Sequence, residues 1–189
     1  MVGLQGFEIT DSDLEAVANW KEIEVVEIID GKQVTDIGLI ALSKLPRLQK
    51  IIIGDTAATQ KGISSFSGHA TLTHFTLINT IIPAQVERIA LEGMPKLTSI
   101  QLSCEGMKSI QLKNLPQLSE LLAFPLSLEE VRFEKLSLIG ELDFLDTKLS
   151  RIELSDLPKL KRLNVKGTKL PAATLKSLKD LPSQPRVIE

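Results

Sequence analysis

Residues 34–53 read VTDIGLIALSKLPRLQKIII, and the same pattern occurs 25 positions earlier in residues 9–28, ITDSDLEAVANWKEIEVVEI. In both stretches a Thr-Asp step is followed by apolar residues at every third position, and then by an apolar-x-x-apolar-x-apolar segment. Nine equivalent positions agree, which chance does not explain even in a chain rich in leucine. The chain therefore contains an internal repeat, which is the sequence sign of a repeat architecture.

Each repeat unit predicts a short helix followed by a strand. Thr10 and Thr35, or the aspartates that follow them, are natural N-caps, because their side-chain oxygens can accept the first free N–H groups of a helix. Apolar residues three positions apart suit a helix with one buried stripe. The alternation at the end of each unit is that of a strand with one buried face.

The strand pattern recurs along the whole chain. Seven segments begin at positions 23, 48, 72, 97, 118, 139 and 160, and from position 97 onward a second series begins at 107, 128 and 149. A strand rises about 3.3 Å per residue and a helix only about 1.5 Å, so the shorter, 21-residue units can close with two extended segments. We therefore expect strands on both sides in the middle of the chain, and strand plus helix at its ends. Near the C-terminus the helical spacing returns at Leu170, Leu175, Leu178 and Leu181, and Val187 falls where a last strand would begin.

The unit Val34-Thr35-Asp36-Ile37-Gly38-Leu39-Ile40-Ala41-Leu42 resembles the V-T-D-x-G-L-x-x-L units of leucine-rich-repeat proteins, in their cysteine-containing or F-box-associated subtype. The 21-residue units resemble a shorter bacterial class of the same family. The resemblance implies an α/β fold: a right-handed solenoid with a concave parallel sheet, helices on the convex side at both ends, and an extended back wall in the middle. It implies one domain over residues 1–189, with about seven repeats and a C-terminal cap. Binding is the commonest role in this family.

Composition narrows the classes of function. The chain is 43% apolar but only 4% aromatic, so its core must be aliphatic, and its net charge of −2 gives no global field that would attract nucleic acid. The single cysteine excludes a disulfide within a monomer, and with no signal peptide at residues 1–8 we expect a cytoplasmic protein. No apolar run approaches the roughly 18 residues that a membrane-spanning helix needs, so no membrane partner is expected.

Strand alternation separates the residues of each unit into inward and outward sets. Ile51, Phe75, Ile100, Leu121 and Leu142 should line up inside, on neighbouring parallel strands. The outward set forms the predicted protein-binding face: Ile29, Lys50, Ile52, His74, Thr76, Ile78, Gln101, Glu120, Leu122, Phe124, Asp143 and Arg162. Five of these are large and apolar, and exposed apolar clusters often mark interaction surfaces. The alternative is that another segment covers them, or that the register is off by one residue in some units.

Charge is distributed unevenly along the chain. Residues 1–30 contain eight acids and one base, a net charge of −7, whereas residues 148–189 contain ten bases and four acids, a net charge of +6. One interpretation is simply two solvated ends. The other is head-to-tail association, or steering of a partner's acidic patch onto the C-terminal end.

The residues that could carry chemistry are few. His69 is expected to be a partly buried structural histidine and His74 an outward one, and their spacing does not suit a zinc site. Cys104 should lie in a turn after a strand as a buried thiol. Glu141 and Asp143 lie two apart on one strand and could imitate a carboxylate pair, but the chain has too few aromatics for a sugar-binding groove. We predict no catalytic residue, cofactor or metal, and hence no enzyme.

The leading hypothesis is therefore a non-catalytic module that binds a partner protein. The alternative is a self-associating structural or scaffold fragment of a larger protein, in which the partner is a second copy. A sensor or adaptor for a small ligand or sugar is a third hypothesis, which the scarcity of aromatic side chains disfavours.

Overall fold

The computed structural model describes residues 1–6, 8–79, 86–123 and 125–189, and it is an α/β fold built mainly of parallel strands. Its elements, in chain order, are β1 (Val2–Gln5), α1 (Asp11–Val17), β2 (Val25–Ile29), α2 (Asp36–Leu42), β3 (Lys50–Gly54), α3 (Gln60–Ser64), β4 (His74–Asn79), β5 (Arg88–Glu92), β6 (Ser99–Cys104), β7 (Ser109–Lys113), β8 (Glu120–Ala123), β9 (Glu130–Glu134), β10 (Glu141–Asp143), β11 (Arg151–Ser155), β12 (Arg162–Asn164), α4 (Ala172–Lys179) and β13 (Arg186–Ile188). None of these helices is long and apolar enough to cross a membrane.

One layer of the molecule consists of strands, and we call it the strand layer. It contains a six-stranded sheet in the order β1-β2-β3-β4-β6-β8 and a three-stranded sheet in the order β10-β12-β13, and every pair is parallel. Ile51, Phe75, Ile100 and Leu121 are register partners on neighbouring strands, as the repeat predicts. These strands make the structure compatible with the expected solenoid-like fold.

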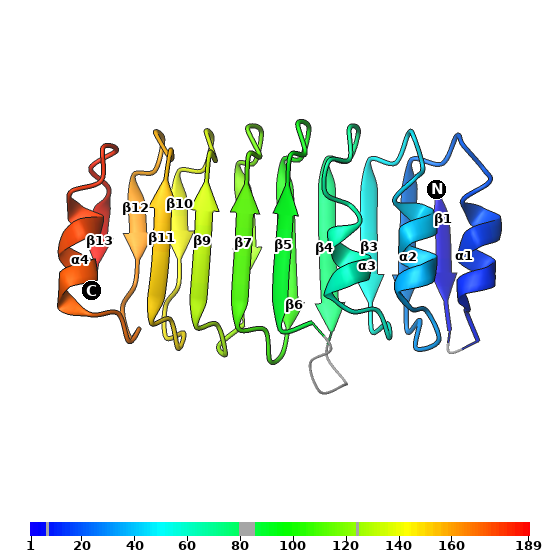
Figure 1. Ribbon diagram of the computed structural model, residues 1–189, viewed down its shortest axis with the longest axis horizontal. Helices are drawn as coiled ribbons and strands as arrows, with labels where there is room; N and C mark the ends of the chain where they lie inside the picture. Colours follow the sequence, from blue (N-terminus) through cyan, green and yellow to red (C-terminus); the bar gives the residue numbers. More distant parts are fainter. Residues whose placement is uncertain (7, 80–85, 124) are drawn as a thin grey trace.

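The opposite layer combines helices and strands, and we call it the mixed layer. Helices α1, α2 and α3 lie side by side at one end, the sheet β5-β7-β9-β11 occupies the middle, and α4 lies at the other end (Figure 1). Strands of this sheet pair at an interval of 21 residues, for example Ile89 with Ile110. The series begins one unit earlier than the sequence analysis predicts, because Val86, Ile89 and Leu91 already follow the pattern. Strand β1 was also not predicted.

The core lies between the two layers and is almost entirely aliphatic. Inward residues of both layers, such as Ile100 and Leu112, are fully buried. Phe66 and Phe75 are also buried and meet edge to face, with ring centroids 5.8 Å apart. Cys104 joins this core as the last residue of β6, so the prediction that it lies in a turn is wrong, although its thiol is buried as expected. Strand β6 continues two residues beyond Leu102, and its alternation turns Cys104 inward.

The Thr-Asp steps link each helical unit to the next. Thr10 and Thr35 are the N-caps of α1 and α2, as predicted. The Asp36 carboxylate accepts hydrogen bonds from the Thr59 N–H and hydroxyl, each at 2.8 Å, and from the Gly62 N–H, also at 2.8 Å. Asp11 accepts the equivalent three bonds one unit earlier. Each aspartate therefore serves the N-terminus of the following helix, where negative charge is favoured.

Candidate functional site

The predicted binding residues lie on the outer side of the strand layer, which we call the outer strand face. Hydrogen-bonded register places them in straight rows across neighbouring strands. One row runs through Lys50, His74, Ser99 and Glu120, and the next through Glu27, Ile52, Thr76, Gln101 and Leu122. The register matches the sequence analysis at each of these strands, so the alternative of a one-residue slip is wrong for this part of the sheet.

The apolar members of this face differ in exposure. Ile29, Ile52 and Ile78 are half-buried, and Leu122 is 39% exposed. Ile29 and Ile78 lie on either side of Gly54, and the Ile29 side chain lies against that glycine, which has no Cβ to exclude it. Phe124 lies outside the described residues. The outer strand face therefore offers aliphatic surface beside polar side chains.

The polar members of the outer strand face are held by their neighbours. The Glu120 carboxylate accepts a hydrogen bond from the Ser99 hydroxyl at 2.8 Å, and Arg162 forms an ion pair with Glu141 at 3.2 Å. The His74 ring is exposed, with Nδ1 2.9 Å from the Thr73 hydroxyl. These contacts fix orientations without neutralising the surface, because the groups stay in contact with water.

Asp143 is a further polar member, and its surroundings differ from those expected. Its carboxylate accepts hydrogen bonds from the Leu145 N–H and from the side-chain amide of Asn164, both at 3.0 Å. Asn164 is the register partner of Asp143, yet it is only 7% exposed, and its side-chain oxygen also accepts a bond from the Lys166 N–H. Glu141 and Asp143 therefore each bond to a side chain of the following unit, Glu141 to Arg162 and Asp143 to Asn164, rather than to each other.

The outer strand face is interrupted between β8 and β10. The expected alignment of Leu142 with Leu121 is not found: Leu142 pairs only on its other side, with Leu163, in the separate three-stranded sheet. We call this interruption the notch. A hollow of about 340 Å³ opens there. It is lined by Leu121, Leu122, Ala123, Leu126, Asp143, Leu145 and Thr147.

The sequence analysis predicted no part of the notch except Leu122 and Asp143. Leu126 is 67% exposed and Leu145 is 45% exposed, so with Leu122 the notch holds three of the large apolar side chains that the described residues leave most exposed. Neither Leu126 nor Leu145 has a place in the repeated strand pattern. Both could have been identified from the sequence as aliphatic residues at positions outside the repeated pattern.

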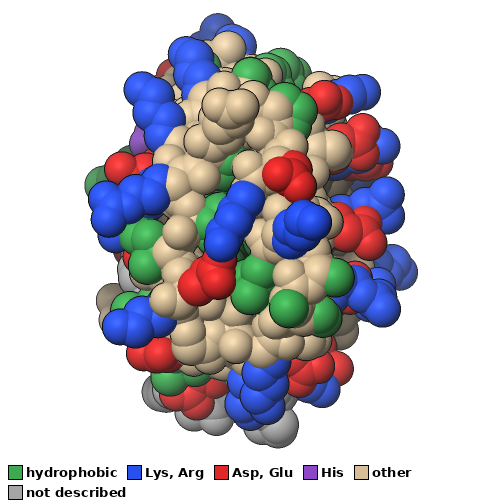
Figure 2. Space-filling view, turned by 90° about the vertical axis from the view of Figure 1, so that its left-hand side faces the viewer, with side chains coloured by type: hydrophobic (Ala, Val, Ile, Leu, Met, Phe, Trp, Pro, Cys, Tyr) green, Lys and Arg blue, Asp and Glu red, His purple; other side chains and the backbone are tan. Residues whose placement is uncertain are grey.

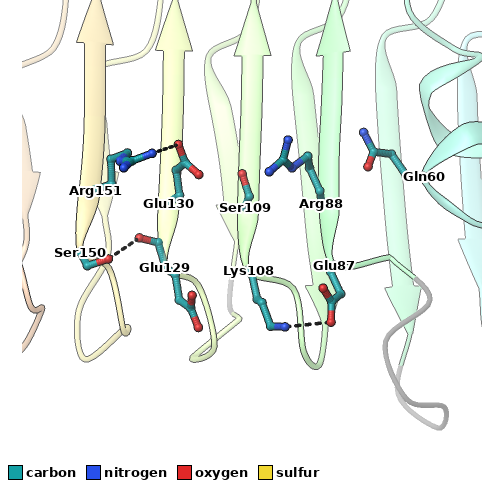
Figure 3. Close-up of a pocket in the computed structure, with 9 residues that line it drawn as sticks. All are labelled: Gln60, Glu87, Arg88, Lys108, Ser109, Glu129, Glu130, Ser150 and Arg151. Atoms are coloured by element: carbon teal, nitrogen blue, oxygen red, sulfur yellow. Dashed lines mark hydrogen bonds and ion pairs between the residues drawn. The ribbon is translucent and has the colours of Figure 1, made fainter.

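A second, polar hollow of about 740 Å³ lies on the outside of the mixed layer (Figure 3). Its side chains come from α3 and from the beginnings of β5, β7, β9 and β11, or from the residues just before them. It is lined by Gln60, Glu87, Arg88, Lys108, Ser109, Glu129, Glu130, Ser150 and Arg151. The 21-residue interval places these charges in rows, but the sequence analysis assigned them no role.

Ion pairs between adjacent strands dominate this polar hollow. Lys108 binds Glu87 at 2.8 Å and Arg151 lies 3.5 Å from Glu130 (Figure 3). The hydrogen bond and charge of Glu87 raise the pKa of Lys108, so the lysine stays protonated. Three basic and three acidic side chains line the hollow and most of them are exposed, so their charges balance and each ion pair contributes little to stability.

The buried imidazole of His69 bonds to main-chain groups. His69 is 9% exposed, as expected of a structural histidine, with Nε2 3.1 Å from the Leu45 carbonyl oxygen, while Nδ1 accepts the Leu72 N–H at 3.2 Å. Burial lowers the pKa of His69, against the opposing effect of the Leu45 carbonyl. In the part of the chain that the structure describes, no three His, Cys, Asp or Glu side chains gather as metal ligands would.

The basic C-terminal end does not present a single cationic patch. Figure 2 shows the end that carries α4 and β13, where Lys and Arg side chains are spread across the face and around its rim, with Asp and Glu among them. Lys179, for example, pairs with Glu189 at 2.5 Å. The excess of positive charge in the sequence is therefore dispersed on this surface.

The chain was compared with protein-family models and with curated proteins. No protein-family model matches the chain, and no curated protein matches it.

Proposed function

We propose that this chain is a leucine-rich-repeat solenoid and that it works as a non-catalytic module, binding a partner protein on the outer strand face. Units of 21 to 25 residues with parallel register between them support the repeat assignment. Repeat folds of this kind present extended surfaces built from many units, and protein binding is a use that such a surface suits.

One observation carries the functional proposal. Partly exposed aliphatic side chains lie within polar rows on a sheet whose backbone is fixed by hydrogen bonds between units. Interfaces commonly combine an apolar centre with a polar rim, and a rigid surface loses little entropy on binding. Ile52 and Leu122 belong to the same row, with Thr76 and Gln101 between them.

The test is affinity capture with matched variants. The purified chain is immobilised, a native lysate is passed over it, and captured proteins are quantified by mass spectrometry. We expect the double variant Ile52→Asp, Leu122→Asp to capture at least tenfold less of a specific partner than the wild type does. The reason is that binding would bury two carboxylates in an apolar contact. Ile37→Asp is the matched control, because Ile37 is a 60% exposed isoleucine of α2, in the mixed layer.

Two outcomes of this capture would contradict the proposal. Equal capture by the double variant and the wild type would exclude the outer strand face as the binding surface. Equal loss with Ile37→Asp would show that the effect is not specific to that face. Circular dichroism of each variant establishes that the fold is retained.

Head-to-tail self-association is the second candidate function, and the charge asymmetry favours it. Residues 1–30 carry −7 and residues 148–189 carry +6, and an attraction between unlike ends would weaken as salt screens it. Light scattering over a concentration series should then show a mass above that of the monomer at low salt. The mass should fall in about 0.5 M NaCl, where screening is strong. A strict monomer at high concentration and low salt would exclude this candidate.

A further inference from the structure

The notch interrupts a hydrogen-bond pattern that is regular elsewhere in the strand layer. The Gly140 carbonyl oxygen, for example, accepts the N–H groups of Lys161 and Arg162 from the following unit, at 2.8 and 3.2 Å. In other units of this layer, one carbonyl oxygen likewise accepts hydrogen bonds from two successive N–H groups of the next unit. Among the described residues, the equivalent bonds from Gly140 and Glu141 to the Ser119 carbonyl are not formed. The N–H groups of Gly140 and Glu141 on one side of the notch, and the Ser119 carbonyl oxygen on the other, therefore do not bond to each other.

The interruption also exposes residues of the interior. Inward residues of the neighbouring strands, such as Ile100 and Leu163, are fully buried. Leu121 occupies the same inward row, yet it is only partly buried and lines the hollow. Ala123, two residues later, behaves in the same way. The hollow thus reaches from the outer strand face to side chains that belong to the core.

Leu126 makes the hollow part of a longer apolar path. It lines the notch on one side and, on the other, a neighbouring hollow of about 450 Å³ that also includes Cys104, Glu105 and Lys148. A peptide in extended conformation places alternate side chains on one side at intervals of about 6.6 to 6.8 Å. The two hollows share Leu126, so a peptide seated in the notch could also reach the second one.

Acidic side chains predominate on the two strands that border the notch, while Lys148 lies in the neighbouring hollow. Of the four outward side chains on β8 and β10, three are acidic: Glu120, Glu141 and Asp143. Glu141 is paired with Arg162, but neither Glu120 nor Asp143 has a basic side chain within ion-pair distance in the described part of the chain. The notch is therefore complementary to a segment that carries Lys or Arg beside its aliphatic residues.

We infer that the notch is the docking point for an extended, basic and aliphatic peptide segment of the partner protein. This inference rests on the proposed function and specifies where on the outer strand face binding takes place, and with what chemistry. The peptide backbone would supply partners for the open groups at Ser119, Gly140 and Glu141, as strands added to a sheet edge do. Its aliphatic side chains would cover Leu122 and Leu126, and its basic side chains would pair with the carboxylates.

The probe for this inference is a capped pentapeptide of alternating lysine and leucine, titrated to millimolar concentration into ¹⁵N-labelled protein. Two control peptides replace lysine with glutamate or leucine with serine. We expect amide shifts at residues 119–123 and 140–145, slower hydrogen exchange at Gly140 and Glu141, and at least tenfold weaker binding of both control peptides. In the variants Leu122→Ser and Leu126→Ser the affinity should fall at least fivefold, whereas Ile37→Ser should leave it unchanged.

The outcomes separate this inference from the proposed function. Shifts confined to the row of Ile52, Thr76 and Gln101 would overturn the notch as the docking point and leave protein binding on the outer strand face intact. Absence of shifts at the notch, or equal binding of the glutamate peptide, would overturn the inference directly. Leu126→Ser keeps the test valid if Leu122→Ser does not fold, because Leu126 is the more exposed of the two side chains.

Discussion

Replacing Asp36 by alanine tests the link between helical units most directly. The substitution removes an acceptor that serves three donors of the following unit, the Thr59 N–H, the Thr59 hydroxyl and the Gly62 N–H, all at 2.8 Å. None of these donors belongs to the helix that carries Asp36. The variant therefore weakens the contact between α2 and α3 while it leaves the aliphatic core unchanged.

The size of the effect follows from the number and kind of bonds. A hydrogen bond to a charged group contributes about 1.5–3 kcal/mol when it is buried, but Asp36 and Thr59 are partly open to solvent, which reduces each contribution. We expect Asp36→Ala to lower the free energy of unfolding by about 2–3 kcal/mol in total. Asp36→Asn should lose about 1–2 kcal/mol, because its amide oxygen retains one acceptor.

Equilibrium unfolding in urea measures this loss. With a urea dependence of about 2 kcal/mol per molar, the midpoint of Asp36→Ala should fall by about 1 M. Asp13→Ala is the control, because among the described residues the Asp13 carboxylate bonds only to Thr10 of its own unit, and its effect should be smaller. A midpoint shift for Asp36→Ala no larger than that of the control would refute the role given to Asp36.

The same variant predicts a dependence on pH. Burial raises the pKa of Asp36, but the hydrogen bonds from Thr59 and Gly62 outweigh it, so the pKa lies below its ordinary value of 3.8. A carboxylate with a lowered pKa stabilises the fold above the pKa of the unfolded chain and loses that effect as the pH falls through the folded pKa. The difference between wild type and Asp36→Ala should thus be full at pH 7 and shrink below about pH 3.8.

Two further substitutions test neighbouring features. Gly62→Ala should destabilise the chain by about 1–3 kcal/mol in urea unfolding, because a Cβ at this position would lie 2.7 Å from the Asp36 carboxylate oxygen; Gly3→Ala, in open space, should have little effect, and equal behaviour of the two would contradict the close approach. His69→Gln should flatten the loss of stability that the wild type shows as the pH falls below 6.5, because burial lowers the pKa of His69 and the unfolded chain takes up the proton first. Parallel pH profiles of the two proteins would show that His69 is not the titrating group.

The sequence predicted the strands of the fold well because each has one buried face. Ile51, Phe75 and Ile100 recur at nearly constant intervals, and the only way to bury them all is on neighbouring strands in register. The N-caps Thr10 and Thr35 were predictable for a local reason, since their side chains act within a few residues. The candidate face followed from the same alternation.

Other features were hidden for identifiable reasons. Strand β5 contains the pattern, but its preceding neighbour in the mixed layer is a helix, so the 21-residue series has no earlier member to reveal it. The Asp36 bonds join residues more than twenty positions apart, and nothing local in Asp36 distinguishes an acceptor for its own helix from one for the next. Whether Cys104 lies in a strand or in a turn depended on how far β6 extends, which the sequence pattern does not define.

By itself, the sequence determined most of the aliphatic side chains that are buried and the interval at which the units follow one another, because burial of aliphatic surface imposes its period on the chain. Only the tertiary structure decided that the strand layer is broken between β8 and β10. Leu118, Leu121 and Ala123 carry the same pattern as the intact units, and whether two strands pair depends on how their backbones are placed relative to each other. The notch, and with it the most exposed leucines of the outer strand face, is therefore a property of the assembled units rather than of any one of them.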